Sequence, residues 1–136
     1  MKMNVWMLIF VIIFMLHNLE EIISVEKWFQ KTYPRVRNRI PSLLQQQLDQ
    51  IGMTTVRFAV VVFVISILAS ILLLISVWTE QYYFFFGISF FFALNIFTHP
   101  LQSLLLRCYT PGLLTTVVLI IPYYGLFFFN FTILNY

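Results

Sequence analysis

Charged residues and cysteine are both scarce in this sequence. Of its 136 residues only 10% are charged, and Cys108 is the single cysteine. One cysteine excludes an internal disulfide and any zinc site built from several cysteines. Hydrophobic residues make up 61% of the chain, and 16 residues are phenylalanine, which excludes an ordinary water-soluble domain. We therefore expect an integral membrane protein.

Four apolar runs have the length of a bilayer crossing. A helix needs roughly 20 residues, at about 1.5 Å each, to cross a hydrocarbon core of about 30 Å. The predicted spans are residues 3–24, 54–78, 82–106 and 111–130. The first run is expected to stay as a span, because no small-residue cleavage site of a signal peptide follows it. Residues 1–136 are thus predicted to form a single all-α membrane domain with four transmembrane helices.

The connections between the spans differ in charge. The second connection holds only Glu80 and the third holds Arg107, whereas the first holds Lys27, Lys31, Arg35, Arg37 and Arg39. Positive charge favours the cytoplasmic side of a membrane. Both termini are therefore predicted to lie outside. At the third connection, Thr110 is expected to cap the fourth helix and Pro111 to lie in its first turn.

The first connection also carries an amphipathic pattern. Its apolar residues recur at helical spacing: Ile40, Leu43, Leu44, Leu48 and Ile51. With the arginines before it, this pattern predicts a short helix in the cytoplasmic headgroup region that binds anionic lipid; a solvated linker is the alternative. Nucleic-acid binding has no support, because topology and anionic lipid explain the basic charge. In the second span, Ser66, Ala69 and Ser70 would permit the close packing of a homodimer.

Two spans carry polar faces. An α-helix turns about 100° per residue, so residues three and four apart share a face. In the first span, His17 shares a face with Glu20 and Glu21. In the third span the residues that share a face are Asn95, His99 and Gln102.

The two histidines lie at the same predicted depth. His17 is eight residues before Val25, where the polar region begins, and His99 is eight residues before Arg107. Both imidazoles are therefore about 12 Å from the cytoplasmic boundary. The first and third spans run in the same direction, so the polar faces are expected to meet. The side chains of His17 and His99 should then lie within about 10 Å of each other on neighbouring helices.

Two prolines lie inside the predicted spans. A proline has no N–H, so Pro100 leaves the carbonyl of Ile96 without its helical partner, and Pro122 does the same to Val118. We expect the third and fourth helices to be disturbed at these points. Broken helices inside a membrane are tolerated where they line protein or a water-filled cavity. The prolines therefore favour a pocket open to the cytoplasmic leaflet.

Carboxylates buried in a membrane need compensation. An ionised residue there costs roughly 2.5–3.5 kcal/mol on insertion scales, and like charges side by side raise the cost. Two imidazoles with two carboxylates suit a divalent metal, zinc above all, with iron or manganese as alternatives. The expected metal ligands are His17, Glu20, Glu21 and His99, and the expected catalytic residues are Glu20 and Glu21. Asn95 and Gln102 are candidates to hold substrate or to support a ligand.

The polar residues occur in a distinctive order. His17-Asn18-Leu19-Glu20-Glu21 is followed by the N-x-x-x-H pattern of Asn95 and His99, then by "YTPG" at 109–112, with Thr115 and Pro122 behind it. Over most of its length the chain resembles the HXXEE-motif family of small bacterial membrane proteins, whose function is uncharacterised. The resemblance implies a four-helix domain in a bacterial plasma membrane. It also adds Tyr109 to the candidate site as a residue that contacts substrate or supports a ligand.

The function expected from these residues is that of a metal-dependent membrane enzyme. A glutamate not fully committed to the metal would act as general base toward water. The substrate would be a lipid or another membrane-soluble molecule, and hydrolysis is preferred over di-iron oxidation because the ligands are too few. Three alternatives stay open: a haem protein with His17 and His99 as axial ligands, a carrier of metal ions or protons, and a structural helix bundle with a buried polar network. Within the last, Glu21 would reach Lys27 or Arg107.

Overall fold

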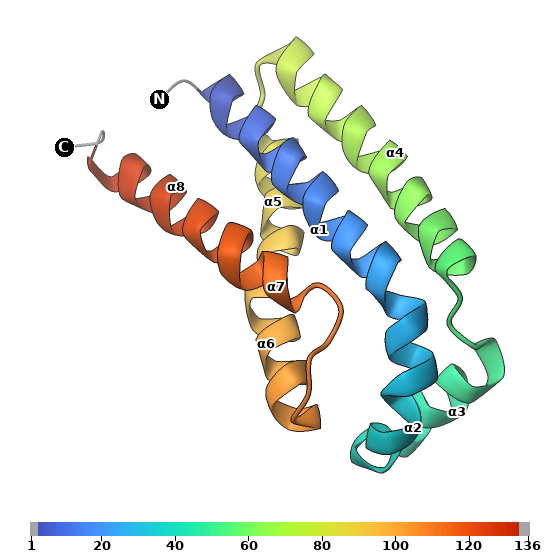
Figure 1. Ribbon diagram of the computed structural model, residues 1–136. Coiled ribbons are helices and arrows are strands. Elements are labelled where there is room, and N and C mark those ends of the chain that lie inside the picture. The colour runs from blue at the N-terminus through green and yellow to red at the C-terminus, as the bar shows by residue number, and fades with distance from the viewer. Residues whose placement is uncertain (1–2, 134–136) are drawn as a thin grey trace.

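The computed structural model describes residues 3–133, and every regular element among them is helical (Figure 1). The α-helices are α1 (Met3–Lys31), α2 (Tyr33–Val36), α3 (Ser42–Ile51), α4 (Thr55–Thr79), α5 (Tyr83–Ala93), α6 (Asn95–Leu106), α7 (Leu113–Thr115) and α8 (Ile121–Ile133). Two further segments differ from the α-helical geometry. The segment η1 (Arg37–Arg39) is a tighter 3₁₀ turn, and η2 (Thr116–Ile120) is a wider π-helical segment.

Four helical stretches are long and apolar enough to cross a membrane: Met3–Lys31, Thr55–Thr79, Tyr83–Leu106 and Leu113–Asn130. This confirms the prediction of an all-α chain with four membrane-length helices and indicates a membrane protein. The first helix is longer than the predicted span. It continues past Ser24 to Lys31 and so carries charged residues beyond its apolar part.

Helix α1 lies in the middle of the bundle. It contacts α4, α5, α7 and η2, and Figure 1 shows it running between α4 and α8 with α5 behind. The core beside it is aromatic. Phe10 of α1 is fully buried and packs edge-on against Phe85 of α5 and Phe92, with ring centroids 5.5 and 5.3 Å apart. Such edge-to-face pairs are favoured by the ring quadrupoles, and they hold the helices that carry the polar residues.

Helix α4 covers one edge of the bundle. Ala69 and Ser76 are its buried residues, and most of its remaining surface is exposed. In a bilayer this surface contacts lipid or another protein. The homodimer expected from the small residues of this helix stays a prediction.

The third membrane-length stretch is interrupted, but not where its proline predicts. The break lies at Leu94, between α5 and α6, and α6 runs unbroken through Pro100. The N–H of Leu94 donates to the carbonyl of Phe91, three residues back, instead of four. Pro100 still leaves the carbonyl of Ile96 without its helical N–H partner, but α6 is continuous from Asn95 to Leu106. The missing bond therefore does not break that helix.

The fourth stretch is disturbed where its proline predicts. Val118 lies inside the π-helical segment Thr116–Ile120, which ends just before Pro122. Since Pro122 has no N–H to offer Val118, the preceding turn can widen at little further cost. This wide turn belongs to the segment that packs against α1 and α6.

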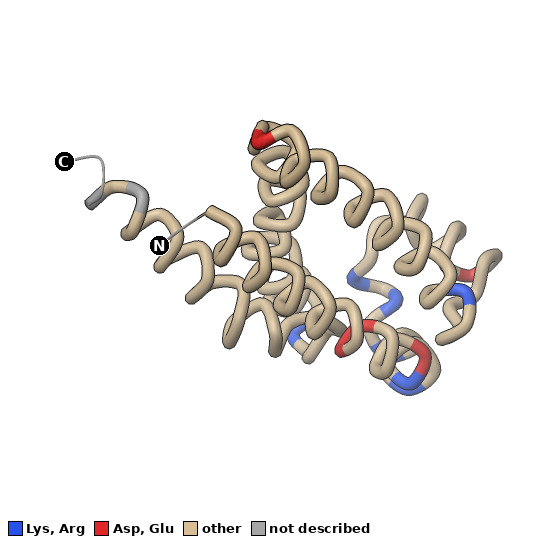
Figure 2. The backbone as a smooth tube through the Cα atoms, turned by 90° about the horizontal axis from the view of Figure 1, so that it is seen from above, with Lys and Arg blue, Asp and Glu red and all other residues tan. Residues whose placement is uncertain are grey.

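The basic connection folds into a small arm at one end of the bundle. Figure 2 shows the Lys and Arg positions gathered at this end. Asp49 of α3 accepts hydrogen bonds from Tyr33 at 2.8 Å and from Arg37 at 2.5 Å, which ties α3 to α2. A further bond from Arg39 to the Leu106 carbonyl, 2.5 Å long, ties the arm to the end of α6. Helix α3 exposes apolar side chains, among them Leu43.

Candidate metal centre

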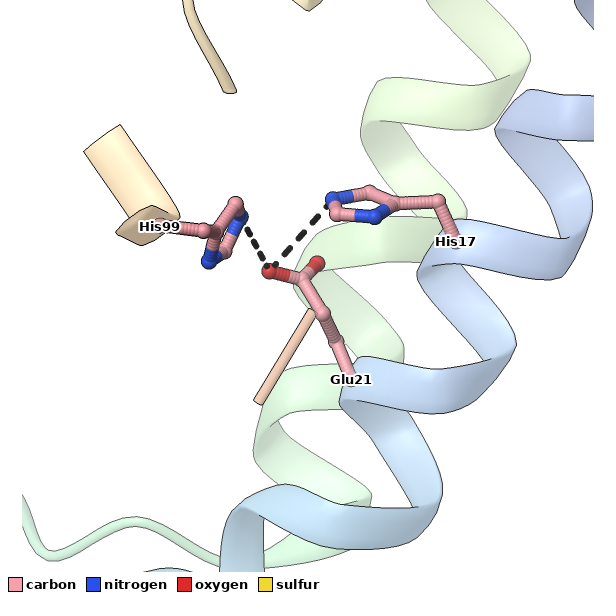
Figure 3. Close-up of side chains that lie close together, drawn as sticks. All are labelled: His17, Glu21 and His99. Carbon is pink, nitrogen blue, oxygen red and sulfur yellow. Dashed lines mark ion pairs between the residues drawn. The ribbon is translucent and has the colours of Figure 1, made fainter. Parts of the chain in front are cut away.

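Three side chains from two helices converge at one point in the bundle. His17 and Glu21 lie one turn apart on α1, and His99 reaches them from α6 (Figure 3). Glu21 Oε1 lies 3.3 Å from His99 Nε2 and 3.8 Å from His17 Nε2. The two imidazole centroids are 5.0 Å apart, which confirms that the histidines meet at one level. We refer to His17, Glu21 and His99 as the histidine–glutamate cluster.

The cluster is nearly closed to its surroundings. His17 is 1% exposed and His99 is 7% exposed, whereas the Glu21 side chain keeps 17% of its surface open. Phe92 packs edge-on against the His17 ring, with centroids 5.4 Å apart. Burial of this kind removes competing water and strengthens electrostatic interactions among the three side chains.

The backbone of Gly112 closes the cluster on the side of the α6–α7 connection. A Cβ placed on Gly112 would lie 2.7 Å from His99 Cε1 and 2.9 Å from His17 Cε1. Both rings thus rest against a residue that has no side chain. Its φ of +84° is in the left-handed region, which glycine adopts without strain. Glycine is therefore required here for its conformation and for its size.

Glu20 does not point into the cluster. Its carboxylate accepts hydrogen bonds from the backbone N–H groups of Leu114 at 3.2 Å and Thr115 at 2.8 Å, and from the hydroxyls of Thr115 and Tyr109. The two N–H groups belong to the first turn of the fourth membrane-length stretch. A carboxylate is favoured at such a position because it meets N–H groups that have no helical partner. Glu20 therefore caps this helix from α1.

The predicted cap of this helix is wrong. The sequence pattern assigns the cap to Thr110, but the helix begins at Leu113, after Gly112, and the buried Thr110 hydroxyl has no hydrogen-bond partner among the described residues. The left-handed turn at Gly112 carries the chain past Thr110 before the helix starts. Glu20 then supplies the acceptor that was expected from Thr110.

Thr115 connects Glu20 to His17. Its Oγ1 lies 2.5 Å from Glu20 Oε2 and 2.8 Å from His17 Nδ1. A hydroxyl has one proton to donate, and a carboxylate that receives four donors acts as an acceptor. Thr115 therefore donates to Glu20 and accepts from His17, which places the proton of His17 on Nδ1. The lone pair of His17 is then on Nε2, the nitrogen that faces Glu21.

This arrangement leaves acceptors facing one another. The Nε2 lone pair of His17 and the Oε1 atom of Glu21 are both electron-rich, yet they lie 3.8 Å apart in a buried space. Either a proton or a cation must lie among the three side chains to make this geometry favourable. His99 Nδ1 is also buried without a hydrogen-bond partner among the described residues.

The other predicted site residues are divided between the cluster and its surroundings. Asn95 is half-buried and lines a cavity of about 220 Å³ together with His17 and Glu21. Gln102 is exposed and lies outside the cluster. Tyr109 donates to Glu20. Burial, and then the bond to Glu20, raise the pKa of Tyr109 to about 12, so that its hydroxyl stays a donor at physiological pH.

Reasoning from sequence missed the part that Gly112 and Thr115 play. Thr115 enters the sequence argument only through the family resemblance, and its contact with His17 joins residues 98 positions apart. The signal for Gly112 is the Pro-Gly pair, which marks a turn but does not say what packs against it.

A family model described as "protein of unknown function with HXXEE motif" matches residues 8–127. No curated protein and no solved structure matches the chain.

Proposed function

Because this chain belongs to the HXXEE-motif family, a family of unknown function, we propose its activity from its own site: a membrane-embedded, metal-dependent hydrolase that acts on a lipid or another membrane-soluble molecule. The observation that carries the proposal is the convergence of His17, Glu21 and His99. One potential ligand atom from each lies within 4.8 Å of the others, and the hydrogen bonds of Thr115 direct the lone pair of His17 toward this point.

The distances suit a small divalent ion. Two ligands bound to zinc at 2.0–2.1 Å with a tetrahedral angle lie about 3.3 Å apart. The Glu21–His99 separation is 3.3 Å, and the Glu21–His17 separation is 3.8 Å. A small movement of either side chain would bring the second distance to the same value. Zinc is the preferred ion for two imidazoles and one carboxylate, and iron or manganese would accept the same donors.

The number of ligands favours catalysis over a structural role. Structural zinc sites have four protein ligands, whereas catalytic sites have three and leave one position open. The cluster offers three, and the cavity lined by Asn95 lies directly beside it. A bound divalent ion supplies Lewis acidity and makes water a better nucleophile near neutral pH. No other metal chemistry is needed for hydrolysis.

The residues of the chain would divide the work as follows. His17, His99 and Glu21 would hold the ion, and the second oxygen of Glu21 would accept a proton from the attacking water. Glu20 and Thr115 are positioning residues, because they set the orientation and tautomer of His17. The sequence offered both glutamates as candidates for the general base. We assign this role to Glu21 alone, since four hydrogen-bond donors already bind the Glu20 carboxylate.

The haem alternative is less favoured by this geometry, and two others differ from the proposal in testable ways. A haem held between the histidines would need room for a porphyrin, whereas the imidazole centroids are 5.0 Å apart and the Gly112 backbone rests against both rings. A purely structural network would require protons to offset the Glu21 charge. A carrier of metal ions would use the same ligands, and an exchange rate fast enough for transport would distinguish it from a resident cofactor.

The same proposal places the chain in a bacterial plasma membrane with both termini outside. Basic residues gathered at the α2–α3 end favour a cytoplasmic location for that end and contact with anionic lipid (Figure 2). The exposed apolar residues of α3, such as Leu43, favour insertion among those lipids. Cysteines introduced near Arg37 should react with an impermeant reagent only from the cytoplasmic side, and those near Glu80 only from outside. Labelling of both from one side contradicts this orientation.

Metal analysis tests the function. Protein purified without a histidine tag should hold about one divalent ion per chain, and His17→Ala, His99→Ala and Glu21→Gln should each lose it while the protein stays folded. Glu80→Gln, which removes a carboxylate on the α4–α5 turn, is the matched control and should keep the ion. If wild-type protein supplied with zinc, iron or manganese binds none of them, the metal proposal is refuted and a proton-compensated network remains.

A further inference from the structure

A cavity lies beside the histidine–glutamate cluster and has two kinds of lining. Its volume is about 220 Å³, and it lies among α1, α4, α5 and the start of α6. Its polar lining includes His17, Glu21 and Asn95, and its apolar lining includes Ala69 and Phe92. A ligand that fits both kinds of lining must have a polar group joined to an apolar portion.

The mouth of this cavity faces the membrane. Ile65 of α4 and Phe91 of α5 line it, and they are 51% and 73% exposed on the outside of the bundle. Residues that belong both to the lining and to the outer surface mark where a cavity opens. Because both lie in the middle of membrane-length helices, the opening is toward the hydrocarbon of the bilayer. A ligand would thus enter sideways, between α4 and α5.

The size of the cavity limits how much of a ligand it encloses. Sites that enclose whole small molecules usually have about 300–1,000 Å³, and this cavity is smaller. It can surround one apolar chain next to a polar group, with the remainder of the chain in the bilayer. A lipid with two chains would have to leave the second chain outside.

The charges around the cavity limit the polar group. No Lys or Arg is among its described lining residues, whereas Glu21 is. The divalent ion of the proposed function and Glu21 together carry one net positive charge. A doubly charged phosphate group would therefore leave one negative charge with no Lys or Arg to neutralise it, which is costly in a buried site. The side chains of Asn18 and Asn95, which also line the cavity, offer amide N–H donors and C=O acceptors. These pair best with an uncharged group such as a carbonyl.

We propose that this cavity binds a single-chain amphiphile with an uncharged carboxylic ester or amide, and that the carbonyl lies between Asn95 and Glu21. The proposal rests on the proposed function and names its substrate class. In the reaction the oxygen of water bonds to the carbonyl carbon, and the C–O or C–N bond breaks. The proton taken up by Glu21 passes to the departing alcohol or amine, and a carboxylic acid remains. The amide N–H of Asn95 donates to the carbonyl oxygen while negative charge develops there.

Photolabelling tests the binding step without depending on turnover. The probe is a saturated-chain N-methyl amide with a diazirine in the chain, used on protein in nanodiscs of neutral lipid. An alkyl phosphate with the same chain and diazirine is the comparison probe. Wild-type protein should be labelled by the amide on α4 and α5, the unlabelled amide should compete, and the phosphate should label these helices about tenfold less or weaker still.

Two matched variants separate the cavity from general lipid contact. Ala69→Phe places a ring in the cavity and should reduce labelling by the amide about tenfold, since overpacking of such a site costs about 1–3 kcal/mol. Ser70→Phe adds the same ring at the next position of α4, which is exposed, and should leave labelling unchanged. Both variants should keep the metal content of the wild type, which also shows that they are folded. Asn95→Leu should weaken labelling by the amide and not by a plain alkane probe.

The outcomes distinguish this inference from the proposed function. Equal labelling of Ala69→Phe and wild type, or preference for the phosphate probe, overturns the substrate class even if the metal is present. The protein could also bind no metal and still be labelled on α4 and α5 in a way that depends on Ala69. That result overturns the metal-dependent function and leaves a binding cavity for neutral amphiphiles. Loss of metal in Ala69→Phe would mean that the variant is disrupted, and the decision then rests on Asn95→Leu and on competition in the wild type.

Discussion

Replacing Gly112 by alanine should damage the protein in two separable ways. The first is steric, because the new Cβ would lie 2.7 Å from His99 Cε1, 2.9 Å from His17 Cε1 and 3.0 Å from His99 Nε2. Two buried rings, each packed on its other side, would have to move. The second is conformational, because the φ of +84° at Gly112 is unfavourable for any residue with a Cβ.

The magnitude follows from these two contributions. Overpacking of a tight site costs about 1–3 kcal/mol, and a non-glycine residue held at an unfavourable positive φ costs about 1–3 kcal/mol. Their sum lowers the free energy of unfolding by about 2–6 kcal/mol, a large part of the roughly 5–15 kcal/mol that stabilises a typical protein. Because the displaced atoms belong to both proposed histidine ligands, metal affinity should fall about 10–100-fold as well.

Two other glycines supply controls for each contribution. Gly52 has a φ of +58°, and a Cβ added there would have no atom within 4 Å, so Gly52→Ala carries the backbone strain alone. Gly87 lies in α5 with free space around it, so Gly87→Ala carries neither cost and should stabilise by about 0.5–1 kcal/mol. The assay is unfolding of the purified variants in mixed micelles, followed by tryptophan fluorescence, with metal content measured on the same samples.

The comparison gives a clear test. Of the three variants Gly112→Ala alone should lose metal, because Gly52→Ala carries backbone strain at its own φ of 58° and ψ of 143° but brings no atom against the histidines. If Gly112→Ala and Gly52→Ala both keep metal, the backbone of Gly112 does not support the histidines. The described geometry of the site would then be wrong.

Three further predictions concern the hydrogen bonds around the site and in the arm. Thr115→Val removes the hydroxyl that fixes the His17 tautomer and should lower metal affinity about 10–100-fold in a metal titration. Thr115→Ser keeps the hydroxyl and should bind metal with nearly the wild-type affinity. If both variants lose the same affinity, the tautomer argument is contradicted. Glu20→Gln replaces one acceptor oxygen by an NH₂ group that faces the donors of Tyr109 or Thr115. The free energy of unfolding should therefore fall by about 1–3 kcal/mol. An unchanged free energy of unfolding would contradict the role of Glu20 as a helix cap. The bonds from Arg37 and then from Tyr33 lower the pKa of Asp49. Its contribution to stability is therefore present above its ordinary pKa and is lost as the pH falls below about 4. The protection of the α3 amides from exchange, relative to their intrinsic exchange rates at each pH, should fall there in the wild type and stay constant in Asp49→Asn.

Sequence was sufficient for the parts of the fold that hydropathy decides. The four membrane-length helices follow from the length of the apolar runs, since a chain in a bilayer must satisfy its backbone within each helix. The meeting of His17 and His99 follows from counting residues to the boundary, because helices that run in the same direction hold equal depths at equal counts. Neither argument needs to know which side chains pack together.

Contacts between helices could not be predicted in the same way. The break at Leu94 is not marked by any glycine or proline at that position, and the nearby Pro100 indicated a later point. The role of Thr115 depends on where the fourth helix begins relative to α1. That start is decided by the turn at Gly112, and the sequence pattern placed it at Pro111.

The division between Glu20 and Glu21 shows what the spacing of the motif achieves. At about 100° per residue, position 20 lies about 60° to one side of His17 around the helix and position 21 about 40° to the other. On the first side lies the start of the fourth membrane-length stretch, whose N–H groups bind Glu20. On the other lies His99, which Glu21 approaches to 3.3 Å. Two adjacent carboxylates would repel each other if they shared one environment. Here Glu20 binds four hydrogen-bond donors, and Glu21 lies against the imidazoles. Glutamates placed three and four residues after a histidine therefore lie on opposite sides of its imidazole, where the first caps a helix and the second is available as a ligand.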